Sequence, residues 1–136
     1  MIQFYFLSIL CNALAGYILS RGESEPEFPM QAGIKLSVDN DTFRLILGIM
    51  TVITGLFKFL SVISGDVPVV GDLLPALFGF TVGFTLLYEY FKKHTSVNLD
   101  VASIAGSFLL KNRRIIGVLS MVVALLHFLF PQVLFL

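Results

Sequence analysis

Residues 45–64 read LILGIMTVITGLFKFLSVIS, and residues 67–88 read VPVVGDLLPALFGFTVGFTLLY. A helix that crosses a hydrocarbon layer of roughly 30 Å needs about 20 consecutive, mostly apolar residues. Both stretches reach that length, and each holds a single side chain that is charged near neutral pH, Lys58 in the first and Asp72 in the second. We therefore predict two membrane-spanning helices joined by a two-residue turn into an antiparallel hairpin.

The same length and apolarity recur at residues 1–20 and 115–136. Apolar residues make up 57% of the chain and charged residues 13%, and the mean hydropathy is +0.91. In soluble domains about a quarter of the residues are charged. We predict an all-α membrane protein, one domain over residues 1–136, with four transmembrane helices and two long loops at residues 21–44 and 89–114. Its partner is then the lipid bilayer, in a plasma or inner membrane.

Apart from Lys58, lysine and arginine residues are gathered in and beside the two long loops, and the hairpin turn and both ends of the chain carry none. Basic residues beside spans are retained on the cytoplasmic side of a membrane. We therefore expect both long loops to be cytoplasmic, with the N-terminus and the C-terminus outside.

The second long loop contains its own helical pattern. Apolar residues recur with helical period and are followed by basic residues: Val101, Ile104, Ala105, Phe108, Leu109, then Lys111, Arg113 and Arg114. Such a pattern is typical of an amphipathic helix lying at an interface that carries anionic headgroups. We predict this helix on the cytoplasmic side.

The chain also shows internal similarity. Residues 44–60 align with residues 113–129 without a gap, and residues 15–19 align with residues 82–86. This predicts two tandem helix–loop–helix repeats of like orientation, related by an axis along the membrane normal. The alternative is that apolar helices align by chance because they use few residue types.

Small residues recur on one face of each predicted span. Those we assign to helix packing are Gly48, Gly55, Gly79, Gly83, Gly117 and Ala124. Small side chains let helix backbones approach closely, which matters in lipid because apolar side chains gain nothing by leaving it. We interpret these faces as packing seams.

Charged groups within spans cost on the order of 2.5–3.5 kcal/mol each on insertion scales, so each needs an explanation. Lys58 and His127 occupy the same position in the two repeats, and Asp66 and Asp72 lie close by in the hairpin. One interpretation is structural, with Asp72 capping the start of a helix. The other is an ion or proton site formed by these four residues near the outer ends of the spans.

Other chemistry finds no support in the sequence. There is one cysteine, there are two histidines on opposite predicted sides of the membrane, and no phosphate-binding loop or metal-binding spacing is present. We expect no catalytic residues, no metal and no cofactor. The formal net charge of zero argues against nucleic acid as a partner. Glu89 is expected to pair with Lys92 or Lys93 at helical spacing.

Three functions fit this pattern. The leading hypothesis is a non-catalytic membrane subunit that packs with other membrane chains in a larger assembly, because small-residue faces occur on all predicted spans. The alternative is a small oligomeric transporter or ion channel built around the four polar residues of the spans. A weaker third is an anchor that recruits a cytoplasmic protein through loops 21–44 and 89–114.

Overall fold

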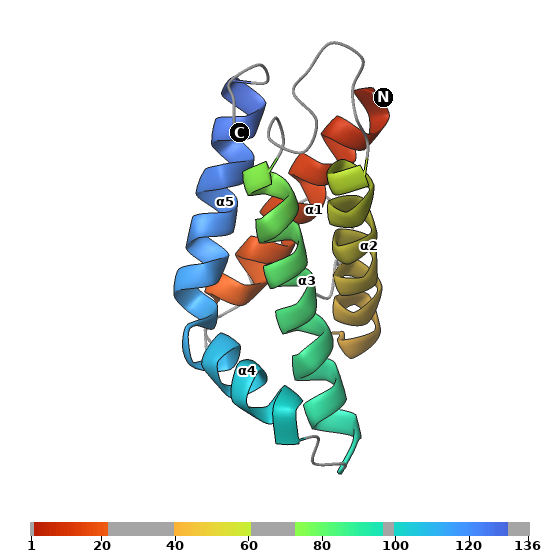
Figure 1. Ribbon diagram of the computed structural model, residues 1–136, viewed down its shortest axis with the longest axis vertical. Helices are drawn as coiled ribbons and strands as arrows, with labels where there is room; N and C mark the ends of the chain where they lie inside the picture. The colour runs from red at the N-terminus through yellow and green to blue at the C-terminus, as the bar shows by residue number, and fades with distance from the viewer. Residues whose placement is uncertain (1, 22–39, 61–72, 97–99, 131–136) are drawn as a thin grey trace, which may run out of the picture.

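The computed structural model describes residues 2–21, 40–60, 73–96 and 100–130. Within these ranges the chain is all helical and contains no strand. The helices, in chain order, are α1 (Ile2–Ser20), α2 (Asp41–Leu60), α3 (Leu73–His94), α4 (Asp100–Lys111) and α5 (Arg113–Leu129) (Figure 1).

Helices α1, α2 and α3 are long and apolar enough to cross a membrane. This agrees with three of the predicted spans, residues 1–20, 45–64 and 67–88, in the parts that the structure describes. Residues 61–72, which hold the predicted two-residue turn, lie outside the described ranges. The fourth predicted span, residues 115–136, is covered in part by the 17 residues of α5, and residues 131–136 lie outside the described ranges. The helix α4 falls within the segment for which the sequence predicts an amphipathic helix.

Two helices extend beyond the predicted spans into segments that we expected to be loops. Helix α2 begins at Asp41, where the side chain of Asn40 accepts a hydrogen bond from the backbone N–H of Thr42 at 3.0 Å and caps the helix. Helix α3 continues through a polar segment to His94. Hydropathy alone detects only the apolar part of a helix, so these charged turns were missed.

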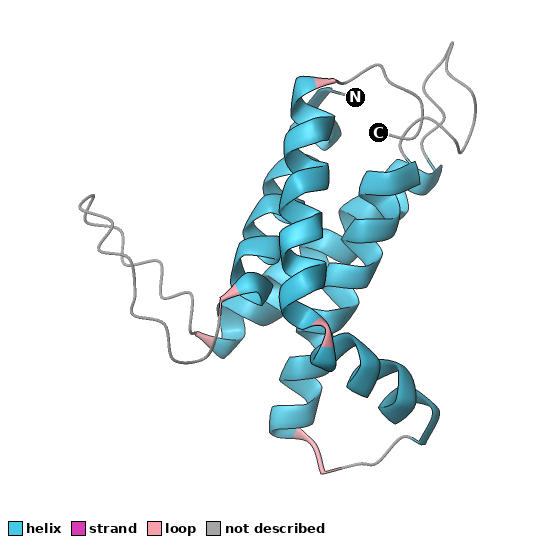
Figure 2. Cartoon of the chain, turned by 90° about the vertical axis from the view of Figure 1, so that its left-hand side faces the viewer, coloured by secondary structure: helices cyan, strands magenta, loops and turns pink. Residues whose placement is uncertain are grey.

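Helices α1 and α3 run in the same direction, and α2 and α5 run in the opposite one (Figure 1). The closest pairs are α2 with α3 and α1 with α5. Helices α1 and α3 also touch across the middle of the bundle, whereas the described parts of α2 and α5 do not approach each other as helices. Helix α4 contacts α3 and α5 and projects away from the bundle (Figure 2).

Glycine pairs mark the crossings of both close helix pairs. Between α1 and α5, a Cβ atom on Gly117 would lie 2.5 Å from the carbonyl oxygen of Gly16 and 2.6 Å from the backbone nitrogen of Ser20. Between α2 and α3, a Cβ atom on Gly83 would lie 2.9 Å from the carbonyl oxygen of Gly48. Only a hydrogen atom fits at such distances, so the backbones themselves are in contact.

The interior of the bundle consists of two layers. Toward the start of α1 the buried side chains are largely polar and comprise Ser8, Asn12, Thr51, Thr54 and Ser120, which we call the polar layer. Toward the end of α1 they form an apolar layer of Ala15, Ile18, Leu19, Leu47, Val82 and Leu86. The helices therefore enclose mostly polar groups in one half of the bundle and mostly apolar ones in the other, where the buried hydroxyl of Thr85 bonds to the carbonyl of Thr81 on its own helix.

Asn12 ties three helices together within the polar layer. Its side-chain nitrogen donates a hydrogen bond to the carbonyl oxygen of Pro75 at 3.1 Å. Its backbone carbonyl oxygen accepts a hydrogen bond from the hydroxyl of Ser120 at 3.0 Å. Thr51 instead bonds to a carbonyl of its own helix, that of Leu47. The inter-helix bonds in this layer therefore centre on one α1 residue.

A first prediction follows from the glycine crossings. Gly117→Ala should lower the free energy of unfolding by about 1–3 kcal/mol, the usual cost of overpacking, because the backbone of α1 has to shift. Gly79→Ala is the matched control, since a Cβ atom there meets its nearest neighbours at 3.4 Å, an ordinary contact. Circular dichroism during unfolding of the purified protein in sodium dodecyl sulfate measures the difference. Equal losses in the two variants would contradict the proposed crossing.

Candidate functional site

Lys58 of α2 and His127 of α5 meet inside the bundle. The Nζ atom of Lys58 lies 3.2 Å from Nε2 of His127. Both side chains are buried, with 8% of Lys58 and 1% of His127 exposed. Their helices do not pack against each other, so the two side chains reach toward each other across the bundle.

Tyr5 of α1 completes this group, which we call the Lys58 cluster (Tyr5, Lys58, His127). Its hydroxyl donates a hydrogen bond to the backbone carbonyl of His127 at 2.8 Å. The Nζ atom of Lys58 lies 5.2 Å from the centre of the Tyr5 ring, within the range of a cation–π interaction. The ring of Tyr5 also contacts that of His127, with 4.8 Å between the ring centres.

The chemistry of the two nitrogen atoms defines what the pair can do. A lysine ammonium group only donates hydrogen bonds, so a charged Lys58 requires Nε2 of His127 to be unprotonated and to accept. A neutral lysine amine instead accepts from a protonated Nε2. In either arrangement one hydrogen lies between the two nitrogen atoms, and the pair can exchange a proton without moving its helices.

The structure brings together two of the four residues in the predicted ion or proton site. Lys58 and His127 are in contact, whereas Asp66 and Asp72 lie outside the described residues. Tyr5 was not singled out by the sequence analysis. No group of three or more histidine, cysteine, aspartate or glutamate side chains within the described ranges is placed to hold a metal ion.

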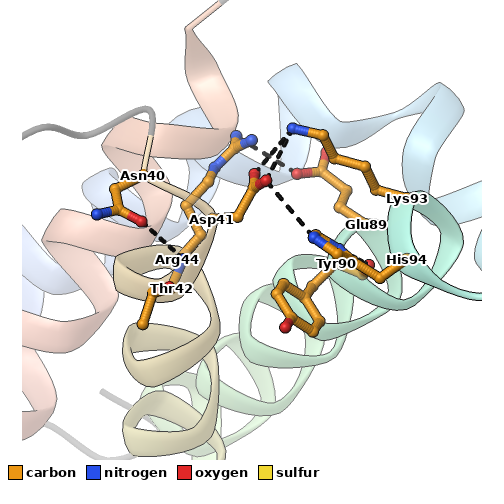
Figure 3. A network of polar contacts seen from close by, with 8 residues as sticks. All are labelled: Asn40, Asp41, Thr42, Arg44, Glu89, Tyr90, Lys93 and His94. Atoms are coloured by element: carbon orange, nitrogen blue, oxygen red, sulfur yellow. Dashed lines mark hydrogen bonds and ion pairs between the residues drawn. The ribbon is translucent and has the colours of Figure 1, made fainter.

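At the opposite end of the bundle, Glu89 lies between two arginines. We call this end, defined by Arg44, Glu89 and Arg113, the basic end. Its Oε2 atom is 3.4 Å from Nη2 of Arg44, and its Oε1 atom is 3.1 Å from Nη1 of Arg113. Figure 3 shows Glu89 facing Arg44. Only 13% of the Glu89 side chain is exposed. One carboxylate thus connects α2, α3 and α5.

A second group of charges lies beside it on the surface. The side chain of Asp41 is 2.9 Å from Nζ of Lys93 and 3.8 Å from the ring of His94 (Figure 3). The Lys93 side chain is 66% exposed, so solvent weakens this pair. The sequence led us to expect Glu89 to pair with Lys92 or Lys93 along α3; the described contacts add Arg44 and Arg113 on two other helices.

The sequence did contain a signal for the basic end. Arg44 and Arg113 are aligned residues in the proposed repeats, as are Lys58 and His127. Both ends of the bundle therefore connect residues of α2 and α5 that are aligned with each other in the sequence. The partner that joins the arginines, Glu89, has no such sequence signal, because its position depends on how α3 is rotated.

Helix α4 is held to the bundle by Gly106, which lies directly on the ring of Tyr88 in α3. On its opposite side Ile104 is 76% exposed and Phe108 is 65% exposed. Such large apolar side chains are rarely grouped on a surface that faces only water. This exposed face of α4 is a candidate interaction surface.

The packing residues assigned from the sequence are found inside the bundle. Gly48 and Gly83 lie at the α2–α3 crossing, and Gly117 lies at the α1–α5 crossing. Gly55 approaches α3 next to Gly79. Ala124, on α5, is also buried.

A model of a protein family of unknown function matches residues 1–127 of the chain. A protein of Treponema pallidum (strain Nichols), described as an uncharacterized protein, is 32% identical over 136 residues that cover the whole of both chains. No solved structure matches the chain. The chain therefore belongs to this family of unknown function and is similar along its whole length to the Treponema pallidum protein.

Proposed function

We propose that this chain is a small membrane transport protein that moves protons through the Lys58 cluster. The observation that carries the proposal is the contact between buried Lys58 and His127 at 3.2 Å. Two titratable nitrogen bases in one apolar helix bundle are costly to bury, and a histidine beside a second base is suited to proton exchange.

The polar layer supports this function by its position. Ser8, Asn12 and Thr54 continue the polar interior from the Lys58 cluster toward the middle of the bundle. Hydroxyl and amide groups both donate and accept hydrogen bonds, so they can order the water molecules that carry protons. The apolar layer ends this path and prevents an open leak across the bundle.

The leading expectation from the sequence, a non-catalytic subunit of a larger membrane assembly, has less support. It relied on small-residue faces available to partners. The glycines at the two crossings contact other helices of the same chain, so those faces are occupied. A partner chain would have to use larger exposed apolar residues, such as Leu125 and Phe128 on α5. Blue-native electrophoresis of a gently solubilised sample tests for such partners.

We further propose that α5 is a fourth span. Its 17 residues extend for about 25 Å at 1.5 Å per residue. Its outer side exposes a continuous series of apolar residues, namely Ile115, Val118, Leu119, Val122, Leu125 and Phe128. By the distribution of basic residues, the basic end and α4 face the cytoplasm and both termini face outward. The exposed face of α4 would then rest on the cytoplasmic lipid surface, with Lys111 near anionic headgroups.

Cysteine labelling tests this orientation. On a Cys11→Ala background, Ser107→Cys in α4 should react with a membrane-impermeant maleimide only from the cytoplasmic side. Gln3→Cys, an exposed position at the start of α1, should react only from outside. Labelling of both positions from the same side would overturn the proposed topology.

The bundle arrangement supports the two tandem repeats. The symmetry axis proposed from the sequence places α1 on α3 and α2 on α5. The helix pair α1–α5 is therefore equivalent to the helix pair α3–α2. These are the two closest helix pairs, and their glycine crossings, Gly16 with Gly117 and Gly83 with Gly48, are repeat-equivalent.

Expressing the halves separately tests the repeat. A chain divided between α2 and α3 should reassemble when both parts are co-expressed, because each half supplies one helix to each of the closest helix pairs. Co-purification through a tag on one half measures this. Recovery of the tagged half alone would contradict the proposal.

Proton flux tests the proposed function directly. In proteoliposomes that contain a pH-sensitive dye, Lys58→Met and His127→Gln should each reduce potential-driven proton uptake by at least about tenfold, the loss expected when a proton-transferring group is removed. Lys93→Met is the matched control, since it makes the same substitution at an exposed lysine at the other end of the bundle.

The comparison of proton uptake in Lys58→Met and Lys93→Met decides whether the Lys58 cluster has a transport role. Uptake that is unchanged in Lys58→Met, or that falls equally in Lys93→Met, would contradict a transport role for the Lys58 cluster. Wild-type protein that carries no protons under any applied potential would return the subunit hypothesis to first place.

A further inference from the structure

We infer that Glu89 is a latch that holds the basic end of the bundle closed, and that its release opens the interior from that end. This inference rests on the proposed transport function, because a transported proton has to reach the polar layer from both sides. It concerns regulation of access to the Lys58 cluster and not the cluster itself.

The first observation is how α2 and α5 are connected. These helices do not pack against each other in the described part of the chain. They are connected by side chains at the two ends of the bundle, directly through Lys58 and His127 and through Glu89 between Arg44 and Arg113. The two connections lie roughly 20 Å apart along α2, at 1.5 Å per residue. If one connection breaks, the other still joins α2 to α5, and the two helices can separate at the broken end.

The second observation is what lies between the two connections. The polar layer adjoins the Lys58 cluster, and the apolar layer lies between it and the basic end. From the basic end, the polar layer is therefore covered first by the Glu89 ion pairs and then by apolar side chains. Apolar contacts are not directional, and the glycine crossings hold α1 to α5 and α2 to α3. Between α2 and α5 themselves, which do not pack against each other, the fixed geometry at this end comes from the two arginine–glutamate pairs.

The third observation is the burial of the latch. The exposed fractions of the Glu89, Arg113 and Arg44 side chains are 13%, 20% and 24%. Partly buried ion pairs are screened much less by solvent and salt than exposed ones. The neighbouring Asp41–Lys93 pair is largely exposed and joins only α2 to α3. Of these charge pairs, only those of Glu89 also hold α5.

The thiol of Cys11 can report opening of the basic end. Cys11 is the single cysteine, it is 4% exposed, and it directly precedes Asn12 of the polar layer on α1. It therefore lies in the polar layer, on the far side of the apolar layer from Glu89. A reagent applied from the basic side reaches this thiol only when that end opens.

The experiment measures how fast a membrane-impermeant methanethiosulfonate cation modifies Cys11 in membrane vesicles of each orientation. Glu89→Gln should raise the rate from the basic side by at least about tenfold, since removal of one partner from partly buried ion pairs shifts an opening equilibrium by that factor or more. The rate from the other side should stay at the wild-type value. Lys93→Gln, which alters only the exposed pair, should leave both rates unchanged.

A second variant guards against a folding defect. Arg113→Gln releases α5 while the Arg44–Glu89 pair remains, and should give an intermediate rate from the basic side. Wild-type rates in both Glu89→Gln and Arg113→Gln would overturn the latch, and so would an equal rise from both sides, which indicates general loosening. The readout requires no flux, so a failed latch leaves the transport result standing, and a chain without proton flux can still show the latch.

Discussion

The close approach of helix backbones at the glycine crossings is the constraint on which the rest of the structure depends. Gly16 meets Gly117 and Gly48 meets Gly83 at distances that exclude any side chain. These contacts set the separation of α1 from α5 and of α2 from α3. Because α1 and α3 also touch, the whole bundle is narrow enough for Lys58 and His127 to meet across it.

The distribution of charge follows from this narrow bundle. A charged group inside an apolar environment is tolerated when it is paired and hydrogen-bonded, and the described structure places its buried ionic groups at the two ends. Lys58 contacts a histidine and an aromatic ring at one end, and Glu89 is held between two arginines at the other. The apolar layer between them keeps the two groups separate. This division of the interior is the physical basis of the proposed one-sided access to the polar layer.

The sequence predicted the helical class and four stretches of membrane-spanning length, of which α1, α2 and α3 are long and apolar enough in the structure. It also singled out Lys58 and His127 as residues that needed an explanation. It placed the start of α2 too late and the end of α3 too early. Hydropathy does not register helical turns that carry charges such as Asp41 or Lys93. The sequence assigned Glu89 to Lys92 or Lys93 on its own helix and did not predict its contacts with Arg44 and Arg113. That assignment used helical spacing, which describes which residues of one helix are close but not which side of the helix faces the bundle.

By itself, the sequence determined where helices of this length occur, because apolar length and helical periodicity are local properties of consecutive residues. It also determined which polar side chains would have to be buried, since they interrupt those apolar stretches. Only the tertiary structure decided their partners. The contact of Lys58 with His127, the placement of Tyr5 beside them and the clamp of Arg44 and Arg113 on Glu89 all depend on how the helices cross and rotate. Those are relations between residues far apart in the chain, which no local pattern specifies.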